Sequence, residues 1–148
     1  MIIHLATDHA GFELKEKLKP FLEKLEHEVI DHGAFEYDEQ DDYPDFVRKA
    51  AEAVAADPER SQGIVLGGSG QGEAMVANRV KGVRAAVYYG GPEEILKLSR
   101  EHNGSNILSL GARFIDEETA KRIVKIWLET PFSGEERHKR RIDKIDSF

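Results

Sequence analysis

The residues best suited to chemistry form one stretch, residues 67–73, in which four glycines within six residues are followed by the carboxylate Glu73. The apolar run 63–66 before it predicts a buried strand, and residues 74–79 after it predict the start of a helix. Glycines allow backbone dihedrals that other residues avoid, so successive N–H groups can converge on one anion at a helix N-terminus. A carboxylate beside such an anion site indicates proton abstraction, with the resulting oxyanion held by the N–H groups.

Other glycine-rich loops fit this stretch less well. A P-loop requires lysine where Glu73 stands. In a dinucleotide-binding fingerprint the third glycine would fall at Glu73, and the acid expected about 20 residues later is replaced by Tyr-Tyr-Gly at 88–90. A receiver domain would end this strand on a phosphate-accepting aspartate, where Leu66 and Gly67 stand. A tight strand–helix turn with Glu73 as an ordinary first-turn acid remains the competing interpretation.

Further polar residues stand at the ends of other predicted elements. Asp8 and His9 end the first apolar segment, and Arg113 directly follows the fifth. Because the carboxyl ends of parallel strands share one edge, we expect these side chains beside the glycine loop. Asp8 could instead only cap the following helix. His102 and Asn103 end a predicted helix and are expected on the same edge, although a histidine there could simply complement the helix dipole.

The C-terminal segment contains two arginines that could bind a phosphate. Arg137 and Arg141 are four residues apart, so they share one face of a helix and could hold a phosphate through forked hydrogen bonds. A solvated helix face paired with Glu135 and Glu136 is the competing interpretation. Taken together, the carboxylate, the anion site, the histidines and the arginines predict proton transfer beside the carbonyl of a phosphorylated small molecule.

The composition disfavours several other classes of function. The formal net charge of −7 argues against a nucleic acid or an anionic membrane as partner. The chain has no cysteine, which removes disulfides, thiolate nucleophiles and cysteine metal sites and predicts a cytoplasmic protein. His27 and His32 do not have a ligand spacing, and the acids of 38–45 lack the pattern of a calcium loop. We therefore expect no metal and no cofactor.

The elements that must position these residues alternate regularly along the chain. Strands are predicted at 2–7, 28–31, 63–66, 83–89 and 107–111, each an apolar run. Helices are predicted between them and after the last, including 12–25, 44–55 and a charged C-terminal helix at 135–148. Uniformly apolar strands alternating with helices predict a parallel five-stranded sheet with helices on both faces, a three-layer α/β sandwich. A chain of 148 residues suits a single domain, 1–148.

The chain also resembles a known family, the ribose-5-phosphate isomerase B family, which includes the galactose-6-phosphate isomerase subunits. The resemblance rests on seven motifs in order: Thr7-Asp8-His9-Ala10-Gly11, Asp42-Tyr43-Pro44-Asp45, 67–73 followed by Ala77-Asn78, Gly82-Val83-Arg84-Ala85-Ala86, His102-Asn103 with Asn106, Leu110-Gly111-Ala112-Arg113, and Arg137-His138 with Arg140-Arg141.

The resemblance implies a Rossmann-like or flavodoxin-like fold that works as a homodimer or homotetramer, with active sites between subunits and no metal or cofactor. The C-terminal helix would then pack on a partner subunit. Part of the family has a catalytic cysteine just before the glycine loop, where this chain has Gly67. Another branch uses a glutamate after the loop, which Glu73 matches.

The resemblance further implies interconversion of ribose 5-phosphate and ribulose 5-phosphate through an enediolate, with a sugar phosphate as the small-molecule partner. Glu73 would be the base, His102 would open the sugar ring and Ser69 would shuttle a proton. The other implied substrate contacts are Asp8 and Asn103 to the sugar, Tyr43 closing over the ring, backbone N–H groups of Gly68, Gly70, Gln71 and Gly72, and phosphate binding by His9, Arg113, Arg137 and Arg141. Two alternatives stay open: a six-carbon substrate such as allose or galactose 6-phosphate, and a non-catalytic sugar-phosphate-binding module.

Overall fold

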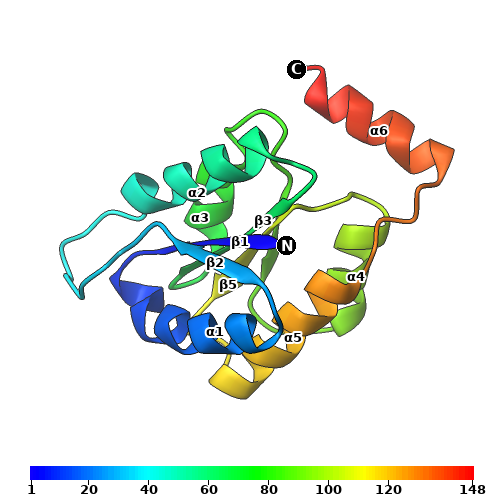
Figure 1. Ribbon diagram of the computed structural model, residues 1–148. Coiled ribbons are helices and arrows are strands. Elements are labelled where there is room, and N and C mark those ends of the chain that lie inside the picture. Colours follow the sequence, from blue (N-terminus) through cyan, green and yellow to red (C-terminus); the bar gives the residue numbers. More distant parts are fainter.

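A parallel sheet of five strands forms the centre of the structure, a computed structural model that describes residues 1–148 (Figure 1). The strand order is β2-β1-β3-β5-β4. The strands are β1 (Ile2–Thr7), β2 (Glu28–Asp31), β3 (Ser61–Gly67), β4 (Ala85–Tyr88) and β5 (Ile107–Gly111). The predicted α/β class with a five-stranded parallel sheet is confirmed. Relative to the flavodoxin-like order 2-1-3-4-5, the last two strands are exchanged.

Helices cover both faces of the sheet and complete the three layers. They are α1 (Phe12–Lys24), α2 (Pro44–Ala56), α3 (Gln71–Ala77), α4 (Glu93–Glu101), α5 (Glu117–Glu129) and α6 (Glu136–Asp146), with a short 3₁₀ turn, η1 (His9–Gly11), before α1. One core lies between the sheet and α1, α4 and α5, and a second lies between the sheet and α2 and α3.

The two faces of β1 show why the layers differ. Ile3 and Leu5 enter the core beneath α1 and α5, whereas Ala6 faces α2. Successive side chains of a strand point to opposite faces, so the larger ones fill one core and a small one lets α2 approach closely. β3 is buried along its whole length because it has a strand on each side and helices on both faces.

The edge strands differ from the uniformly apolar strands that the sequence predicts. In β2, Glu28 and Ile30 are exposed, and β4 is half-buried along most of its length. Each of these strands has a neighbour on one side only, so its outer side and part of one face remain open to solvent. The buried character that we expected of every strand therefore holds for β1, β3 and β5.

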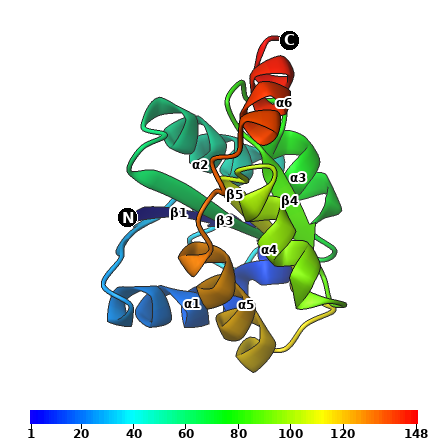
Figure 2. The ribbon, with the colours of Figure 1, turned by 90° about the vertical axis from the view of Figure 1, so that its right-hand side faces the viewer.

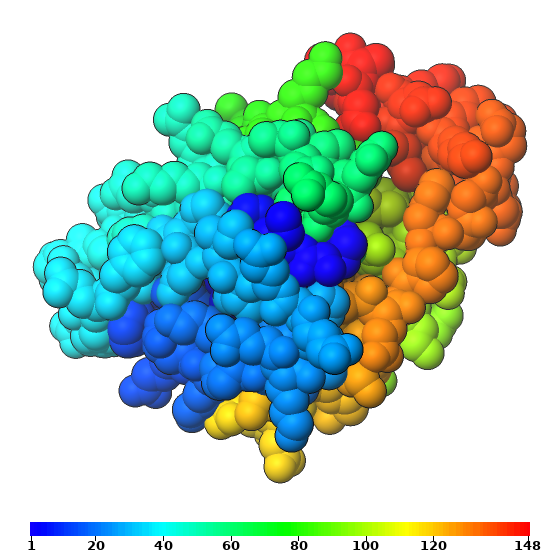
Figure 3. All heavy atoms as spheres, viewed as in Figure 1, coloured from blue at the N-terminus to red at the C-terminus, as the bar shows by residue number.

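The C-terminal helix α6 stands apart from the layers. It extends beyond the sheet in two perpendicular views (Figures 1 and 2), and the space-filling view shows it as a lobe at one corner of the molecule (Figure 3). An ion pair between Arg84 and Asp146, 3.1 Å long, links it to the start of β4. Its side chain Ile145 is 47% exposed. That α6 packs on a partner subunit stays a prediction.

None of the helices combines the length and the apolar character that crossing a membrane requires.

Candidate active site

The glycine loop joins β3 to α3 and is shaped by one left-handed residue. Gly70 has a φ of +78° and sits at the N-cap of α3. A β-carbon at Gly70 would also press against the backbone of Leu110 at 3.0 Å. The carbonyl oxygen of Gly70 accepts a hydrogen bond of 2.6 Å from Ser109 Oγ, a fully buried hydroxyl of β5. This hydrogen bond from β5 thus holds the glycine loop in place.

The other glycines of the loop provide space rather than unusual dihedrals, which corrects the reason that the sequence suggested for them. Their φ angles are not positive. A β-carbon at Gly67 would collide with the carboxylate of Glu73, one at Gly68 would lie 3.1 Å from the guanidinium of Arg113, and one at Gly72 would collide with the hydroxyl of Tyr43. Three side chains that the sequence predicted for the site therefore lie against backbone that carries no side chain.

Glu73 lies in the first turn of α3 with its carboxylate over Gly67. The residue is 4% exposed. Burial raises the pKa of Glu73, because a carboxylate loses hydration there, and the nearby Asp8 carboxylate raises it further. A carboxylate with a raised pKa is a stronger base near neutral pH, which is the property that proton abstraction requires.

A cavity of about 520 Å³ opens above the loop. Its lining brings together eight residues that the sequence predicted for the site: Asp8, His9, Tyr43, Gly68, Ser69, Gly72, Glu73 and Arg113. Ala10 and Phe114, which the sequence did not suggest, complete the lining. Of the remaining loop residues, Gly70 is buried and does not line the cavity, and the side chain of Gln71 is exposed.

Asp8 serves as the helix cap that the sequence allowed and also faces the cavity. Its Oδ1 accepts a hydrogen bond of 2.9 Å from the N–H of Ala10, at the N-cap of η1. The residue is 7% exposed. Thr7, before it, donates its hydroxyl to the carbonyl of Leu66 at 2.9 Å. This bond ties the end of β1 to the end of β3, so Asp8 and Glu73 are held on one rim.

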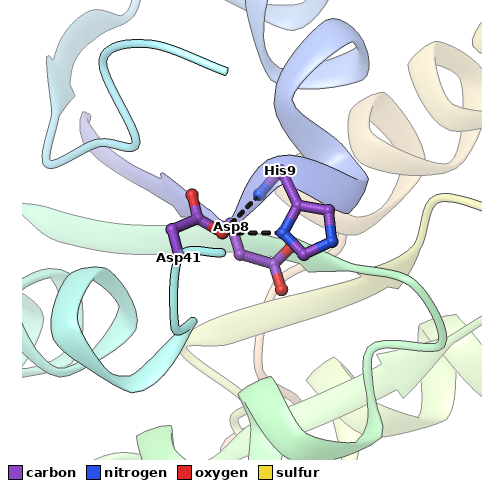
Figure 4. A group of neighbouring side chains, drawn as sticks. All are labelled: Asp8, His9 and Asp41. Carbon is purple, nitrogen blue, oxygen red and sulfur yellow. Dashed lines mark hydrogen bonds and ion pairs between the residues drawn. The ribbon is translucent and has the colours of Figure 1, made fainter. Parts of the chain in front are cut away.

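His9 pairs with Asp41 from the loop before α2 (Figure 4). Oδ1 of Asp41 lies 2.7 Å from His9 Nδ1 and accepts the backbone N–H of His9 at 3.0 Å. This bond raises the pKa of His9, which favours the cationic ring. Ligand atoms of Asp8, His9 and Asp41 lie within 4.8 Å of one another and could hold a cation. The hydrogen bond between Asp41 and His9, however, already accounts for their contact as an ion pair.

The structure contradicts one expectation about placement. In a single chain, His102 and Asn103 lie at the amino edge of the sheet, opposite the cavity. Arg84, just before β4, donates from Nε to the carbonyl of Asn103 at 3.0 Å, and Gly63 N–H in β3 bonds the carbonyl of Asn106 at 2.9 Å. A helix that follows a parallel strand runs back along it, so α4 must end at the amino edge.

The arginines of α6 belong to this amino edge as well. α1 and α2 begin on the left of Figure 1, at the carboxyl edge, whereas α6 lies at the upper right. Arg137 is exposed and bonds Glu135 at 2.9 Å, and Arg141 is also exposed. Neither lines the cavity of Glu73. The residues that the sequence predicted for one site therefore fall into two groups on opposite edges of the sheet.

The group at the amino edge includes a histidine that stacks on a second histidine. The rings of His102 and His138 stack with centroids 4.3 Å apart and planes inclined by 15°. His138 is 4% exposed, and burial lowers its pKa. A larger cavity of about 640 Å³ lies nearby, between α6 and the body. That cavity lacks Glu73 and the glycine loop, so the smaller one is the better candidate for acid–base chemistry.

Reasoning from sequence missed three residues that shape the site: Thr7, Asp41 and Ser109. Thr7 and Ser109 read as ordinary strand residues, and no local signal shows that their hydroxyls bond the chain near the loop. Asp41 lies in an acidic segment in which no single acid stands out. Its partner, His9, is 32 positions away.

Comparison with known proteins identifies the family. Residues 3–145 match the family model described as Ribose/Galactose Isomerase. The chain belongs to that family. The ribose-5-phosphate isomerase B of Mycolicibacterium paratuberculosis is 47% identical over 148 residues, all of this chain and 91% of that protein.

Solved structures of family members share the fold closely. The ribose-5-phosphate isomerase B of Mycoplasma genitalium with bound ribulose-5-phosphate superposes with a TM-score of 0.93 at 38% identity, covering 99% of this chain and 94% of that one. The Clostridium thermocellum ribose-5-phosphate isomerase B gives 0.91 at 44% identity, covering 99% and 96%.

Proposed function

We propose that this protein interconverts ribose 5-phosphate and ribulose 5-phosphate through an enediolate, with Glu73 as the base. The observation that carries the proposal is the buried carboxylate of Glu73, with its raised pKa, beside a glycine loop that opens into a cavity with His9 and Arg113 on its wall. Full-length relatives named ribose-5-phosphate isomerase B support the substrate.

In the proposed reaction, Glu73 removes the proton from C2 of the open-chain aldose and returns it to C1. Backbone N–H groups of residues 68–72 stabilise the developing oxyanion, and one such donor is typically worth roughly 3–4 kcal/mol. Ser69 passes a proton between the two substrate oxygens, which completes the exchange of carbonyl and hydroxyl. Asp8 holds sugar hydroxyls, and Tyr43 closes over the ring.

A second copy of the chain completes the site in this proposal. His102 would open the sugar ring, Asn103 would orient the sugar, and Arg137 and Arg141 would hold the phosphate with His9 and Arg113. Support comes from their common position on an edge that cannot reach the cavity of the same chain, and from the exposed α6. The proposed assembly is a homodimer or a homotetramer, and the proposed location is the cytoplasm.

The base is tested by the variant Glu73→Gln, assayed with ribose 5-phosphate. We expect kcat to fall by about 10² to 10⁴, the usual contribution of positioned acid–base transfer. A folded variant that turns over at the wild-type rate would show that another group is the base. Ribose 5-phosphate that binds to the wild type without conversion would instead support a non-catalytic binding module.

The shared site is tested by mixing two inactive variants. Glu73→Gln and His102→Asn, unfolded and refolded together, would form mixed dimers in which one site has both residues intact. Random pairing would restore about a quarter of the wild-type activity, because half of the two-fold dimers are mixed and each has one good site. No recovery, with mixed dimers demonstrated by mass, would place both residues in one chain's site.

The family description also includes galactose, so a six-carbon sugar phosphate is the second candidate substrate. Following aldose–ketose conversion over a panel of pentose and hexose phosphates decides between them. A higher kcat/KM for allose or galactose 6-phosphate than for ribose 5-phosphate would change the assignment.

A further inference from the structure

The loop between β2 and α2 bonds His9 through one carboxylate, that of Asp41. Oδ1 of Asp41 contacts both the ring nitrogen Nδ1, at 2.7 Å, and the backbone N–H of His9, at 3.0 Å. The side chain of Asp41 is 9% exposed, and its second oxygen, Oδ2, is buried without a hydrogen-bond partner. A buried carboxylate with one oxygen left unsatisfied is costly, so the bonds to His9 must offset that cost.

The pair fixes the orientation of the imidazole ring. An ionised carboxylate only accepts hydrogen bonds, so Nδ1 of His9 carries a proton. Nε2 therefore lies on the side of the ring turned away from Asp41 (Figure 4), and His9 lines the cavity. Tyr37 packs edge-on against the ring, with centroids 6.2 Å apart and planes at 87°. Asp41 and Tyr37 come from the same loop, and together they restrict rotation of the ring.

With the ring in this orientation, the charge of His9 determines whether Nε2 can donate a hydrogen bond to a phosphate. With Nδ1 protonated, a neutral ring presents a bare lone pair at Nε2, which would repel a phosphate oxygen. Only the doubly protonated ring donates from Nε2 while keeping its bond to Asp41. The hydrogen bond to Asp41 is the largest influence and raises the pKa of His9. Burial and the positive charge of Arg113 lower this pKa, whereas the negative charge of Asp8 raises it. Asp41 is thus the main group that favours the donating form.

We propose that Asp41 is a positioning residue: it holds His9 as a cation whose Nε2–H faces the cavity and binds the phosphate of the substrate. This inference rests on the proposed function, which gives His9 the phosphate. Asp41 itself is not among the residues that line the cavity of Glu73. Its loss should therefore weaken binding of phosphate groups and leave the chemical step largely intact.

Two variants separate the charge of Asp41 from its geometry. In Asp41→Asn the amide oxygen can still accept from Nδ1, so the ring stays oriented while the charge that stabilises the cation is lost. Asp41→Ala removes both. Asp38→Asn is the matched control, because it makes the same change of charge in the same loop at an exposed residue whose Oδ1 caps Gln40 N–H at 2.9 Å. His9→Gln gives the effect of losing the ring.

The measurements are NMR titration of the His9 ring and the affinity for inorganic phosphate, between about pH 6 and 9, a range that spans the ordinary histidine pKa and the alkaline side of it. In Asp41→Asn we expect His9 to titrate at lower pH. Phosphate affinity should fall by about tenfold near pH 8, the factor that one pKa unit represents, and recover toward pH 6. Asp41→Ala should bind phosphate more weakly at every pH, and Asp38→Asn should match the wild type.

Kinetics add a readout that a purely structural role would not give. For Asp41→Asn, KM for ribose 5-phosphate should rise toward that of His9→Gln, with kcat within about twofold of the wild type. Unchanged His9 titration and phosphate affinity in both Asp41 variants would overturn the inference, as would an equal loss in Asp38→Asn. The NMR and phosphate measurements do not depend on turnover, so they judge this inference even if the wild type fails to isomerise ribose 5-phosphate.

Discussion

Gly67 and Glu73 occupy one space: the carboxylate of Glu73 lies where a side chain at position 67 would begin. Gly67 does not have a positive φ, so only this contact excludes a larger residue. A base on residue 67 and a base on residue 73 are therefore alternatives in this site. This relationship gives a physical reason why a chain that uses Glu73 has glycine at position 67.

Gly67→Ala tests this relationship. The added methyl group must displace the carboxylate of Glu73, so we expect kcat to fall toward the level of Glu73→Gln while the backbone remains unstrained. Steady-state kinetics on the two single variants and the double variant measure the coupling. If the methyl group acts through Glu73, adding Gly67→Ala to Glu73→Gln should change the residual rate by less than about twofold, since contacting residues are strongly non-additive. If the two losses of kcat instead multiplied in the double variant, the methyl group would act on the reaction independently of Glu73.

Glu73→Gln should make the protein more stable at alkaline pH. The pKa of Glu73 is raised in the folded state by burial, so the folded protein holds a proton that the unfolded chain has already released. Stability is therefore lost as pH rises from the ordinary glutamate value, about 4.3, through the folded pKa, and the cost persists above it. Glutamine removes that cost, so its Tm should exceed that of the wild type near pH 8 and match it below about pH 4.

The control for this stability effect is Glu118→Gln, another acid in the first turn of a helix, α5, but an exposed one. Both variants lose the same favourable interaction with a helix N-terminus. Only Glu73→Gln also relieves the burial of a charge. A gain in Tm of the same size in Glu118→Gln, or no gain in Glu73→Gln, would contradict the expected cause.

Ser109→Ala should reduce both activity and stability. It removes the buried bond of 2.6 Å to the carbonyl of Gly70, which holds the glycine loop in place. A lost hydrogen bond of this kind costs about 0.5–1.5 kcal/mol. The control is Thr130→Val, which deletes a hydroxyl bonded to the carbonyl of Ile126, also at 2.6 Å, at the end of α5. We expect both variants to lose Tm and only Ser109→Ala to lose kcat; equal kcat values would show that Ser109 has no effect on the loop.

Removal of metals should leave activity unchanged. The proposed steps use Glu73, backbone N–H groups and cationic side chains, so treatment with a chelator followed by gel filtration should preserve kcat for ribose 5-phosphate. The cluster of Asp8, His9 and Asp41 makes the test specific, because these residues could hold a cation. Activity that is lost on chelation and restored by an added divalent ion, but not restored in Asp41→Asn, would assign a metal to this cluster.

The class of fold and most of the residues that line the cavity follow from the amino-acid sequence alone. Buried parallel strands are continuous apolar runs, and their ends are marked by Asp8, Gly67 and Arg113. Since such ends share one edge, these positions had to come together around Glu73. The position of His102 at the amino edge also follows from the order of elements, because a helix after a parallel strand must run back along it.

The contacts between side chains that are far apart in the chain are known only from the folded structure. Ser109 supports Gly70, Asp41 orients His9, and Glu73 fills the space over Gly67. Each contact depends on the exact separation and rotation of packed elements, which hydrophobic periodicity does not specify. The same holds for α6: its sequence predicts a charged helix, but its separation from the layers arises because it has no core of its own chain to cover.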